Sequence, residues 1–190
     1  MFHNVWNPKE QYDDICALVR KVRDISGSLI EVGCWEGNST NNIANACYPE
    51  ILLCNDTWKG NVEESIATGV RHPTEIMAAE RDVYATFLHN MTTLTKGNFL
   101  PVRRDCIEWL QEYKEPIKFI YIDASHEYKS VILTIELVKP LLVKGAILCG
   151  DDYETAHMGR DDLQGGVEKA VRETCPGFQT KGNLWYWILR

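Results

Sequence analysis

The chain has 190 residues, of which 45% are hydrophobic and 25% are charged, so it has the composition of an ordinary globular protein and not of a disordered or fibrous one. Its 27 acidic residues outnumber 20 lysines and arginines, and the net charge of −7 argues against partners such as nucleic acid or an anionic membrane. A chain of this length suffices for one domain, and we expect residues 1–190 to form a single domain.

The seven cysteines include no CxxC pair, which excludes zinc knuckles and thioredoxin-like redox motifs. The first residues, MFHNVWNPKEQYDD, lack the pattern of a secretory signal. No apolar run reaches the roughly 18 residues that a membrane helix needs. Together these features predict a reduced, soluble, cytoplasmic protein.

Two helical segments are expected outside the alternating part of the chain. Asn7-Pro8-Lys9-Glu10 has the signature of a helix start, and the apolar spacing that follows predicts a helix to about residue 25 within an N-terminal segment of residues 1–27. Residues 59–72 contain two glycines and are expected to form a mobile loop. Pro73 should then begin one helix whose apolar stripe extends to Met91.

The rest of the chain alternates short apolar runs with helical spacing, which predicts strands that alternate with helices. Because these runs are continuously apolar, the strands should be buried on both faces of a mostly parallel sheet. The last two strands are separated by a short turn, so the final one is expected to be antiparallel. The expected strands are 29–33, 51–56, 99–102, 117–123, 146–150, 177–180 and 184–189, and the helices are 38–47, 105–113, 128–142 and 167–174.

Acidic residues follow the expected strands. In an open α/β sheet, ligands bind at the carboxyl ends of the strands, so side chains that follow the strands should lie at the binding site. Each of five parallel strands ends in or just before an acid, and five such positions in register favour a functional site over chance loop composition. The acids are Glu36, Asp56, Asp105, Asp123 and the pair Asp151 and Asp152.

Gly33 and Gly37 allow a tight turn after the first strand, where the backbone can approach a ligand closely. This is not the G-x-G-x-x-G pattern of dinucleotide sites, and Glu36 within the turn would repel a phosphate. The turn therefore favours a cofactor without phosphate. Asp56 can accept both hydroxyls of a ribose, which keeps an adenosine moiety plausible; the alternative is that Asp56 only caps a turn.

The order Glu31-x-Gly33-x-x-x-Gly37, Asp56, Asp105 and Ile122-Asp123 resembles class I S-adenosylmethionine-dependent methyltransferases over nearly the whole chain. Three further stretches are similar to a small-molecule branch that includes macrocin O-methyltransferase-like proteins and proteins labelled cephalosporin hydroxylase. These stretches are Asp56-Thr57-Trp58-x-Gly60, Tyr121-Ile122-Asp123-x-x-His126-x-Tyr128 and Gly150-Asp151-Asp152-Tyr153.

The resemblance implies a Rossmann-like, doubly wound seven-stranded sheet and S-adenosylmethionine as the cofactor. Glu31, Gly33 and Gly37 would shape the pocket for its methionyl part, Asp56 would hold the ribose, and Asp105 with Cys106 would lie near the adenine. The complete set of expected cofactor residues is Glu31, Gly33, Cys34, Gly37, Asp56, Thr57, Asp105, Cys106 and Asp123.

By the same resemblance, Asp123, Asp151 and Asp152 match acids that hold a divalent ion, either Mg²⁺ or Ca²⁺. Three converging carboxylates would repel one another without a cation, and hard oxygen ligands suit these ions. His126 follows the fourth strand and is the candidate general base, with Asp123 as the second catalytic residue. Close relatives often read Asp-Gly-x-His where this chain has Asp123-Ala124-Ser125-His126, and some sugar methyltransferases carry a second acid where Ser125 stands. This departure bears on how tightly a metal is held.

We therefore expect methyl transfer to an oxygen of a small hydroxylated acceptor, and we expect residues 59–91 to cover that acceptor. The sequence also leaves a homo-oligomer open. Two alternatives remain open. The Asp123, His126, Asp151 and Asp152 cluster could serve a metal-dependent hydrolase or oxygenase, or the chain could be a degenerate S-adenosylmethionine-binding domain. Four other histidines have no partner pattern and are expected at the surface or in structural roles: His3, His72, His89 and His157.

Overall fold

The computed structural model describes residues 2–3, 5–153 and 166–190. In this part of the chain, seven strands form one sheet in the order β3-β2-β1-β4-β5-β7-β6. The pairs β1–β2, β1–β4, β2–β3 and β4–β5 are parallel, whereas β7 is antiparallel to both β5 and β6. The strands are β1 (Ser28–Val32), β2 (Leu52–Asp56), β3 (Phe99–Arg103), β4 (Ile117–Ile122), β5 (Leu142–Gly150), β6 (Gln179–Lys181) and β7 (Leu184–Ile188).

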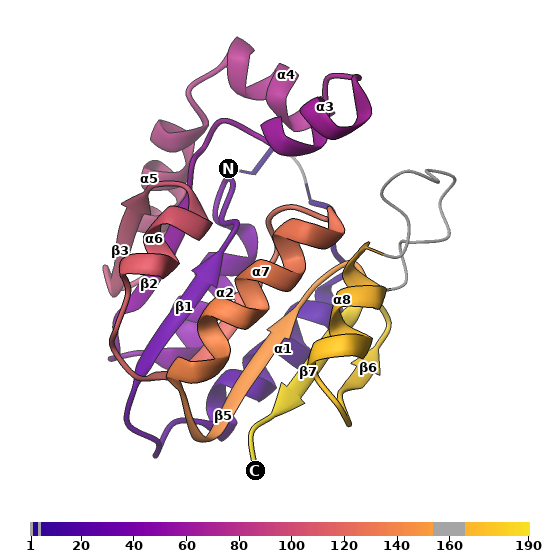
Figure 1. The fold of residues 1–190 in the computed structure, drawn as a ribbon. Coiled ribbons are helices and arrows are strands. Elements are labelled where there is room, and N and C mark those ends of the chain that lie inside the picture. The colour runs from indigo at the N-terminus through magenta and orange to yellow at the C-terminus, as the bar shows by residue number, and fades with distance from the viewer. Residues whose placement is uncertain (1, 4, 154–165) are drawn as a thin grey trace.

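Helices cover both faces of this sheet (Figure 1). One buried apolar cluster joins the sheet to α1, α2 and α5, and a second joins its other face to α6, α7 and α8. All six residues of the central strand β4 are buried, which explains why its sequence does not alternate. The helices are α1 (Lys9–Lys21), α2 (Asn38–Cys47), α3 (Val62–Thr68), α4 (Pro73–Glu80), α5 (Val83–Leu94), α6 (Cys106–Glu112), α7 (Tyr128–Val138) and α8 (Gly166–Thr174), with a 3-10 turn, η1 (Lys139–Leu141).

The predicted fold class is confirmed, including the antiparallel final strand. Three predicted boundaries are wrong. The first helix ends at Lys21 and not near residue 25, because the chain leaves helical geometry at Val22. The helix expected over 128–142 is α7 followed by η1, since Pro140 cannot continue an α-helix. Strand β5 therefore begins at Leu142, earlier than expected.

The segment from residue 59 to residue 91 also differs from its prediction. The expected loop contains α3, and the single helix expected after Pro73 is two helices, α4 and α5. The helix is interrupted at Arg81 and Asp82, and the Asp82 carboxylate caps α5 by accepting a hydrogen bond from the Ala85 amide. As a result the apolar stripe is core only in α5, whereas α4 has no buried residue.

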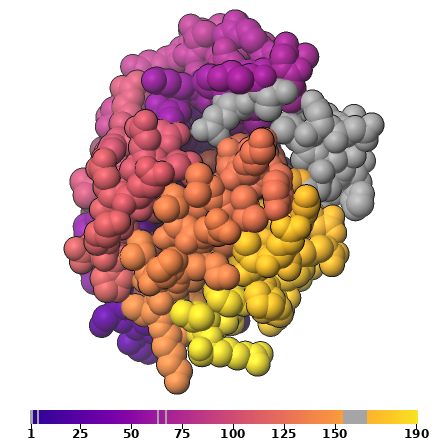
Figure 2. Space-filling view, in the orientation of Figure 1, coloured from indigo at the N-terminus to yellow at the C-terminus, as the bar shows by residue number. Residues whose placement is uncertain are grey.

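Helices α3 and α4 lie beyond the carboxyl ends of the strands, near the N-terminus of the chain (Figure 1). In the space-filling view, the magenta segment that carries them caps one end of the molecule (Figure 2). All seven cysteines are free thiols. None of the helices in the described residues could cross a membrane.

Gly33 closes the contact between the ends of β1 and β4. Its φ is +89°, and a Cβ there would lie 1.8 Å from the carbonyl oxygen of Asp123. The Asp123 amide donates a hydrogen bond to Val32 across the same junction. Only glycine therefore lets the two strand ends meet, and their meeting places the glycine turn beside Asp123.

The substitution Gly33→Ala should lower the free energy of unfolding by more than about 3 kcal/mol, because it combines a backbone clash with left-handed strain. Gly97→Ala is the matched control: Gly97 has a similar φ of +77° but open space where the Cβ would stand, so only about 1 kcal/mol of strain is expected. Urea unfolding of both variants checks this. Equal losses would contradict the packing role of Gly33.

Candidate active site

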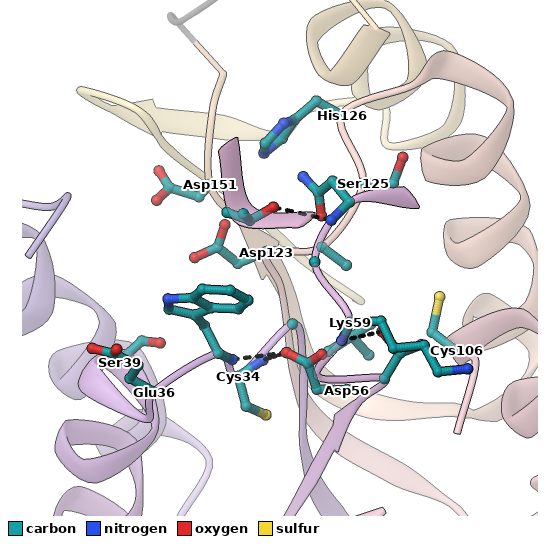
Figure 3. A pocket seen from close by; sticks show the side chains of 18 of the residues that line it. Cys34, Glu36, Ser39, Asp56, Lys59, Cys106, Asp123, Ser125, His126 and Asp151 are labelled. Atoms are coloured by element: carbon teal, nitrogen blue, oxygen red, sulfur yellow. Dashed lines mark hydrogen bonds between the residues drawn. The ribbon is translucent and has the colours of Figure 1, made fainter. Parts of the chain in front are cut away.

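A cavity of about 640 Å³ opens at the carboxyl ends of the strands, where the strand order reverses between β1 and β4. Its walls come from the glycine turn, the ends of β2, β4 and β5, the N-terminal segment and the α3–α4 segment. The cavity has two ends (Figure 3). Asp56, Lys59 and Cys106 lie at one end, and Asp123, His126 and Asp151 lie at the other. The expected site residues, except Glu31 and Gly37, are thus brought to one cavity from distant parts of the sequence.

Asp56 ties the glycine turn to the end of β2. One of its carboxylate oxygens accepts hydrogen bonds from the amides of Cys34 (2.8 Å) and Trp35 (2.7 Å), and the other accepts one from the amide of Trp58 (2.6 Å). Burial raises the pKa of Asp56, and these amides oppose that shift. These amides occupy at least three of the roughly four acceptor positions of the carboxylate.

Backbone strain gathers around this cavity. The non-glycine residues with positive φ in the described chain are Trp35 (47°), Trp58 (54°) and Asp152 (62°). Trp35 and Asp152 line the cavity, and the Trp58 indole donates a hydrogen bond to the carbonyl of Trp35. Such conformations cost about 1–3 kcal/mol each and persist where surrounding contacts enforce them, typically at functional sites.

Glu31 reaches the cavity through Ser39. The Glu31 side chain is fully buried and does not line the cavity, but the Ser39 hydroxyl lines it and donates to Glu31 Oε1. Among the described residues, no group donates a hydrogen bond to the buried Glu31 Oε2. Burial raises the pKa of Glu31 to about 7, despite the hydrogen bond from Ser39. Gly37 likewise shapes the turn from outside the lining, at the start of α2 with a φ of +89°.

The cavity lining on the other side of Asp56 includes Thr57, Asp105 and Cys106. Asp105 is also the N-cap of α6, where its carboxylate accepts a hydrogen bond from the Glu108 amide at 3.0 Å. Asn55 fixes the neighbouring backbone by donating to the carbonyls of Val102 and Arg104. This end of the cavity is therefore a rigid crevice between the ends of β2 and β3.

Asp123, His126 and Asp152 each offer a ligand atom, and these atoms lie within 4.8 Å of one another. His126 Nε2 is 2.6 Å from a carboxylate oxygen of Asp152. Burial and the neighbouring charges of Asp151 and Asp152 raise the pKa of Asp123 well above its usual range. His126 offsets part of this negative charge, and a divalent cation would neutralise more of it.

Asp151 lies beside this group, but its carboxylate faces the N-terminal segment. It accepts hydrogen bonds from the side-chain amides of Asn7 and Gln11, and from the amide of Asp152. Burial and the charge of Asp152 raise the pKa of Asp151. Of the three acids expected to hold a metal, the structure groups Asp123 and Asp152 with His126 and holds Asp151 in a cluster of amides.

His126 has a second acidic partner that the sequence did not suggest. Glu64, from α3, lies with its carboxylate 2.9 Å from His126 Nδ1 and also accepts the His126 backbone amide. Burial opposes charge on His126, but hydrogen bonds to Asp152 and Glu64 outweigh it and raise the pKa of His126 well above its usual value. His72 Nε2 is 3.6 Å from Glu64, so His72 contributes to the same group.

Glu36 is buried in the glycine turn and accepts hydrogen bonds from His3, through both backbone and ring, while Arg81 forms an ion pair with it. Burial opposes its charge, but these partners lower the pKa of Glu36. Trp6 packs against Trp35 with ring centroids 6.0 Å apart. His3 and His72 thus have structural partners at the cavity, and His157 lies outside the described residues. Sequence spacing gave no signal for these long-range pairs.

Residues 30–153 match the model of a family described as a methyltransferase domain, and the chain belongs to that family. It is a methyltransferase by this match, and S-adenosylmethionine is the cofactor expected for the domain. A search of curated proteins finds no match to this chain.

Several solved structures share the fold at low sequence identity. CalS11, described as a TDP-rhamnose 3′-O-methyltransferase of calicheamicin biosynthesis, is 18% identical with a TM-score of 0.61 over 94% of this chain and 79% of its own. The O-methyltransferase NovP is 17% identical with a TM-score of 0.63 over 95% and 79%. A putative rRNA methylase from Clostridium thermocellum is 15% identical with a TM-score of 0.61 over 96% of each chain. At these identities the likeness shows the fold and leaves the acceptor to the site itself.

Glu31 predicts a specific dependence of stability on pH. Its pKa is about 7 in the folded protein against an ordinary value of 4.5, so the folded state binds the proton more tightly and stability falls as pH rises between those values. Glu31→Gln removes this loss and should be more stable than wild type by about 3 kcal/mol at pH 8, with the difference vanishing near pH 4.5. Chemical unfolding across that range measures the difference.

The control is Glu112→Gln, which removes an exposed carboxylate paired with Arg104. Exposed pairs contribute little to stability, so this variant should track wild type at every pH. A constant offset between Glu31→Gln and wild type from pH 5 to pH 8 would contradict the raised pKa of Glu31.

Proposed function

We propose that this methyltransferase moves the methyl group of S-adenosylmethionine to an oxygen of a small hydroxylated acceptor such as a sugar or a natural product. The observation that carries the proposal is the two-ended cavity of Figure 3. A buried carboxylate that holds the glycine turn, Asp56, lies at one end, and an acid–histidine group lies at the other. The glycine turn joins the two ends.

The cofactor fits the first end. Asp56 would accept the ribose hydroxyls, with the adenine between Thr57 and the Asp105–Cys106 crevice. The methionyl part would follow Gly33 and Cys34 toward Ser39, whose hydroxyl is held by Glu31. The positive charge of the cofactor would favour the ionised form of Glu31 and would offset the cost of burying its Oε2 atom.

The second end fits a divalent cation. Asp123 and Asp152 supply hard oxygen ligands, and Asp151 supports them from its amide cluster. A bound Mg²⁺ or Ca²⁺ would orient the acceptor hydroxyl and lower its pKa. The same charge would compete with His126 for Asp152, which weakens one of the two contacts that keep the imidazole charged.

His126 is the residue placed to receive the proton. Since Nδ1 faces Glu64, Nε2 is the nitrogen that faces the acid group. S-adenosylmethionine would supply the methyl group: the acceptor oxygen would bond to its carbon, the carbon–sulfur bond would break, and the electron pair would stay on sulfur. Because the contacts with Asp152 and Glu64 favour a charged imidazole, His126 would accept the hydroxyl proton at Nε2 only after that nitrogen has lost its own proton. Alignment of oxygen, carbon and sulfur by the two ends of the cavity supplies most of the remaining acceleration.

The segment from residue 59 to residue 91 walls the acceptor side of the cavity. Val62, Pro73 and Met77 line it, and Trp6 of the N-terminal segment lines the same cavity. These walls combine apolar surface with few positive charges, which suits a small, largely uncharged acceptor. The net charge of −7 and the acidic cavity disfavour a polyanion such as RNA.

Calorimetric titration with S-adenosylhomocysteine and with Mg²⁺, separately and together, tests the proposal. We expect binding of the cofactor product without metal and loss of at least tenfold in affinity for Asp56→Asn. Binding of metal with no binding of the cofactor product would favour the hydrolase or oxygenase alternative. Cofactor binding without methyl transfer to any member of a panel of hydroxylated compounds would favour the degenerate domain.

The roles of the acid group separate in three variants. Asp152→Asn should weaken Mg²⁺ binding at least tenfold, because a charged oxygen ligand is lost, whereas Asp151→Asn should weaken it less. His126→Gln should retain Mg²⁺ and cofactor binding but lose methyl transfer. If His126→Gln lost the metal as completely as Asp152→Asn, His126 would be a ligand and not the base.

A further inference from the structure

Glu64 is a buried acid that the proposed reaction does not use directly. Its side chain is 1% exposed, although it lies on α3 at the rim of the cavity in the 59–91 segment. Its carboxylate accepts hydrogen bonds from the His126 backbone amide at 2.8 Å and from the Asn61 side chain at 3.1 Å, and it lies 2.9 Å from His126 Nδ1. A buried carboxylate is costly unless several donors satisfy it, as they do here.

The position of Glu64 in its helix makes this contact notable. It is the third residue of α3, where a glutamate usually folds back to the amide of the N-cap residue. Here the amide of the N-cap, Asn61, donates instead to the Thr74 hydroxyl at 3.0 Å. The Glu64 carboxylate is thereby available to His126, which is 62 residues away in the sequence.

The contact fixes His126 in two ways. The bond to its backbone amide holds the chain just after β4, and the bond to Nδ1 sets the orientation of the ring. With Nδ1 turned to Glu64, Nε2 is presented to Asp152 and the acid group. Because Glu64 belongs to the segment that walls the acceptor side, the orientation of the ring depends on that segment being docked.

We propose that Glu64 is a positioning residue that holds His126 and couples the docking of α3 to the orientation of the catalytic imidazole. The inference rests on the proposed function only for the role of His126 in proton transfer. The coupling between α3 and the histidine stands on the contacts themselves. Seating of α3 over an acceptor would thus orient the imidazole at the same time.

Nuclear magnetic resonance of protein labelled with ¹⁵N-histidine, in complex with S-adenosylhomocysteine at a fixed neutral pH, tests the coupling. His126→Gln assigns the ring signals. In wild type, Nδ1 should show one hydrogen-bonded environment, and Glu64→Ala should move the Nδ1 resonance toward that of a free imidazole. Glu64→Gln keeps an acceptor oxygen and should shift it less. Glu80→Gln, an exposed residue at the end of α4 in the same segment, is the matched control and should leave it unchanged.

Hydrogen exchange supplies the reciprocal measurement. If α3 and His126 hold each other, the amides of Val62–Thr68 should exchange about tenfold faster in both Glu64→Ala and His126→Ala, and at the wild-type rate in Glu80→Gln. Affinity for S-adenosylhomocysteine should change less than twofold in every Glu64 variant, since the cofactor residues lie at the other end of the cavity.

Unchanged Nδ1 signals in Glu64→Ala, or faster exchange in Glu64→Ala but not in His126→Ala, would overturn the proposal and leave Glu64 with a role inside α3 only. Failure of S-adenosylhomocysteine to bind wild type would instead count against the proposed function. In that case the exchange measurements, made without ligand, still decide the coupling.

Discussion

The carboxylate of Asp56 is the contact on which the site depends. It accepts three backbone hydrogen bonds, two from the glycine turn and one from its own strand end, and so fixes the turn against β2. Gly33 fixes the same turn against β4 because no side chain fits there. Between these two constraints the turn has one conformation, strained at Trp35, and that conformation defines the floor of the cavity.

The second constraint is the cost of burying carboxylates, and this cost is offset differently at each buried acid. Glu36 pairs with Arg81 and accepts hydrogen bonds from His3, and Glu64 pairs with His126 and accepts a hydrogen bond from Asn61. Burial raises the pKa of Glu31 and of Asp123, and the partners they have among the described residues do not offset it. The satisfied acids hold the covering segments in place. The unsatisfied ones face the positions where a sulfonium cofactor and a divalent cation would bring positive charge.

Local sequence predicted the sheet because the apolar runs are short, continuous and separated by helical spacing, as in β4. It also placed Asp56 and Asp123 correctly in the cavity, since strand ends meet at one edge. It missed α3, and it missed the break at Asp82, where the Asp82 cap of α5 interrupts the apolar stripe. It could not anticipate Glu64 and His126, or Asp151 and Gln11, because these pairs join residues 62 and 140 positions apart with no local pattern.

The most direct test is a crystal structure of the complex with S-adenosylhomocysteine. The account predicts ribose hydroxyls within hydrogen-bond distance of Asp56, with the bonds from Cys34 and Trp35 intact, and the homocysteine part along the turn toward Ser39. A ligand bound outside this cavity, or a ribose beyond hydrogen-bond distance of Asp56, would contradict it.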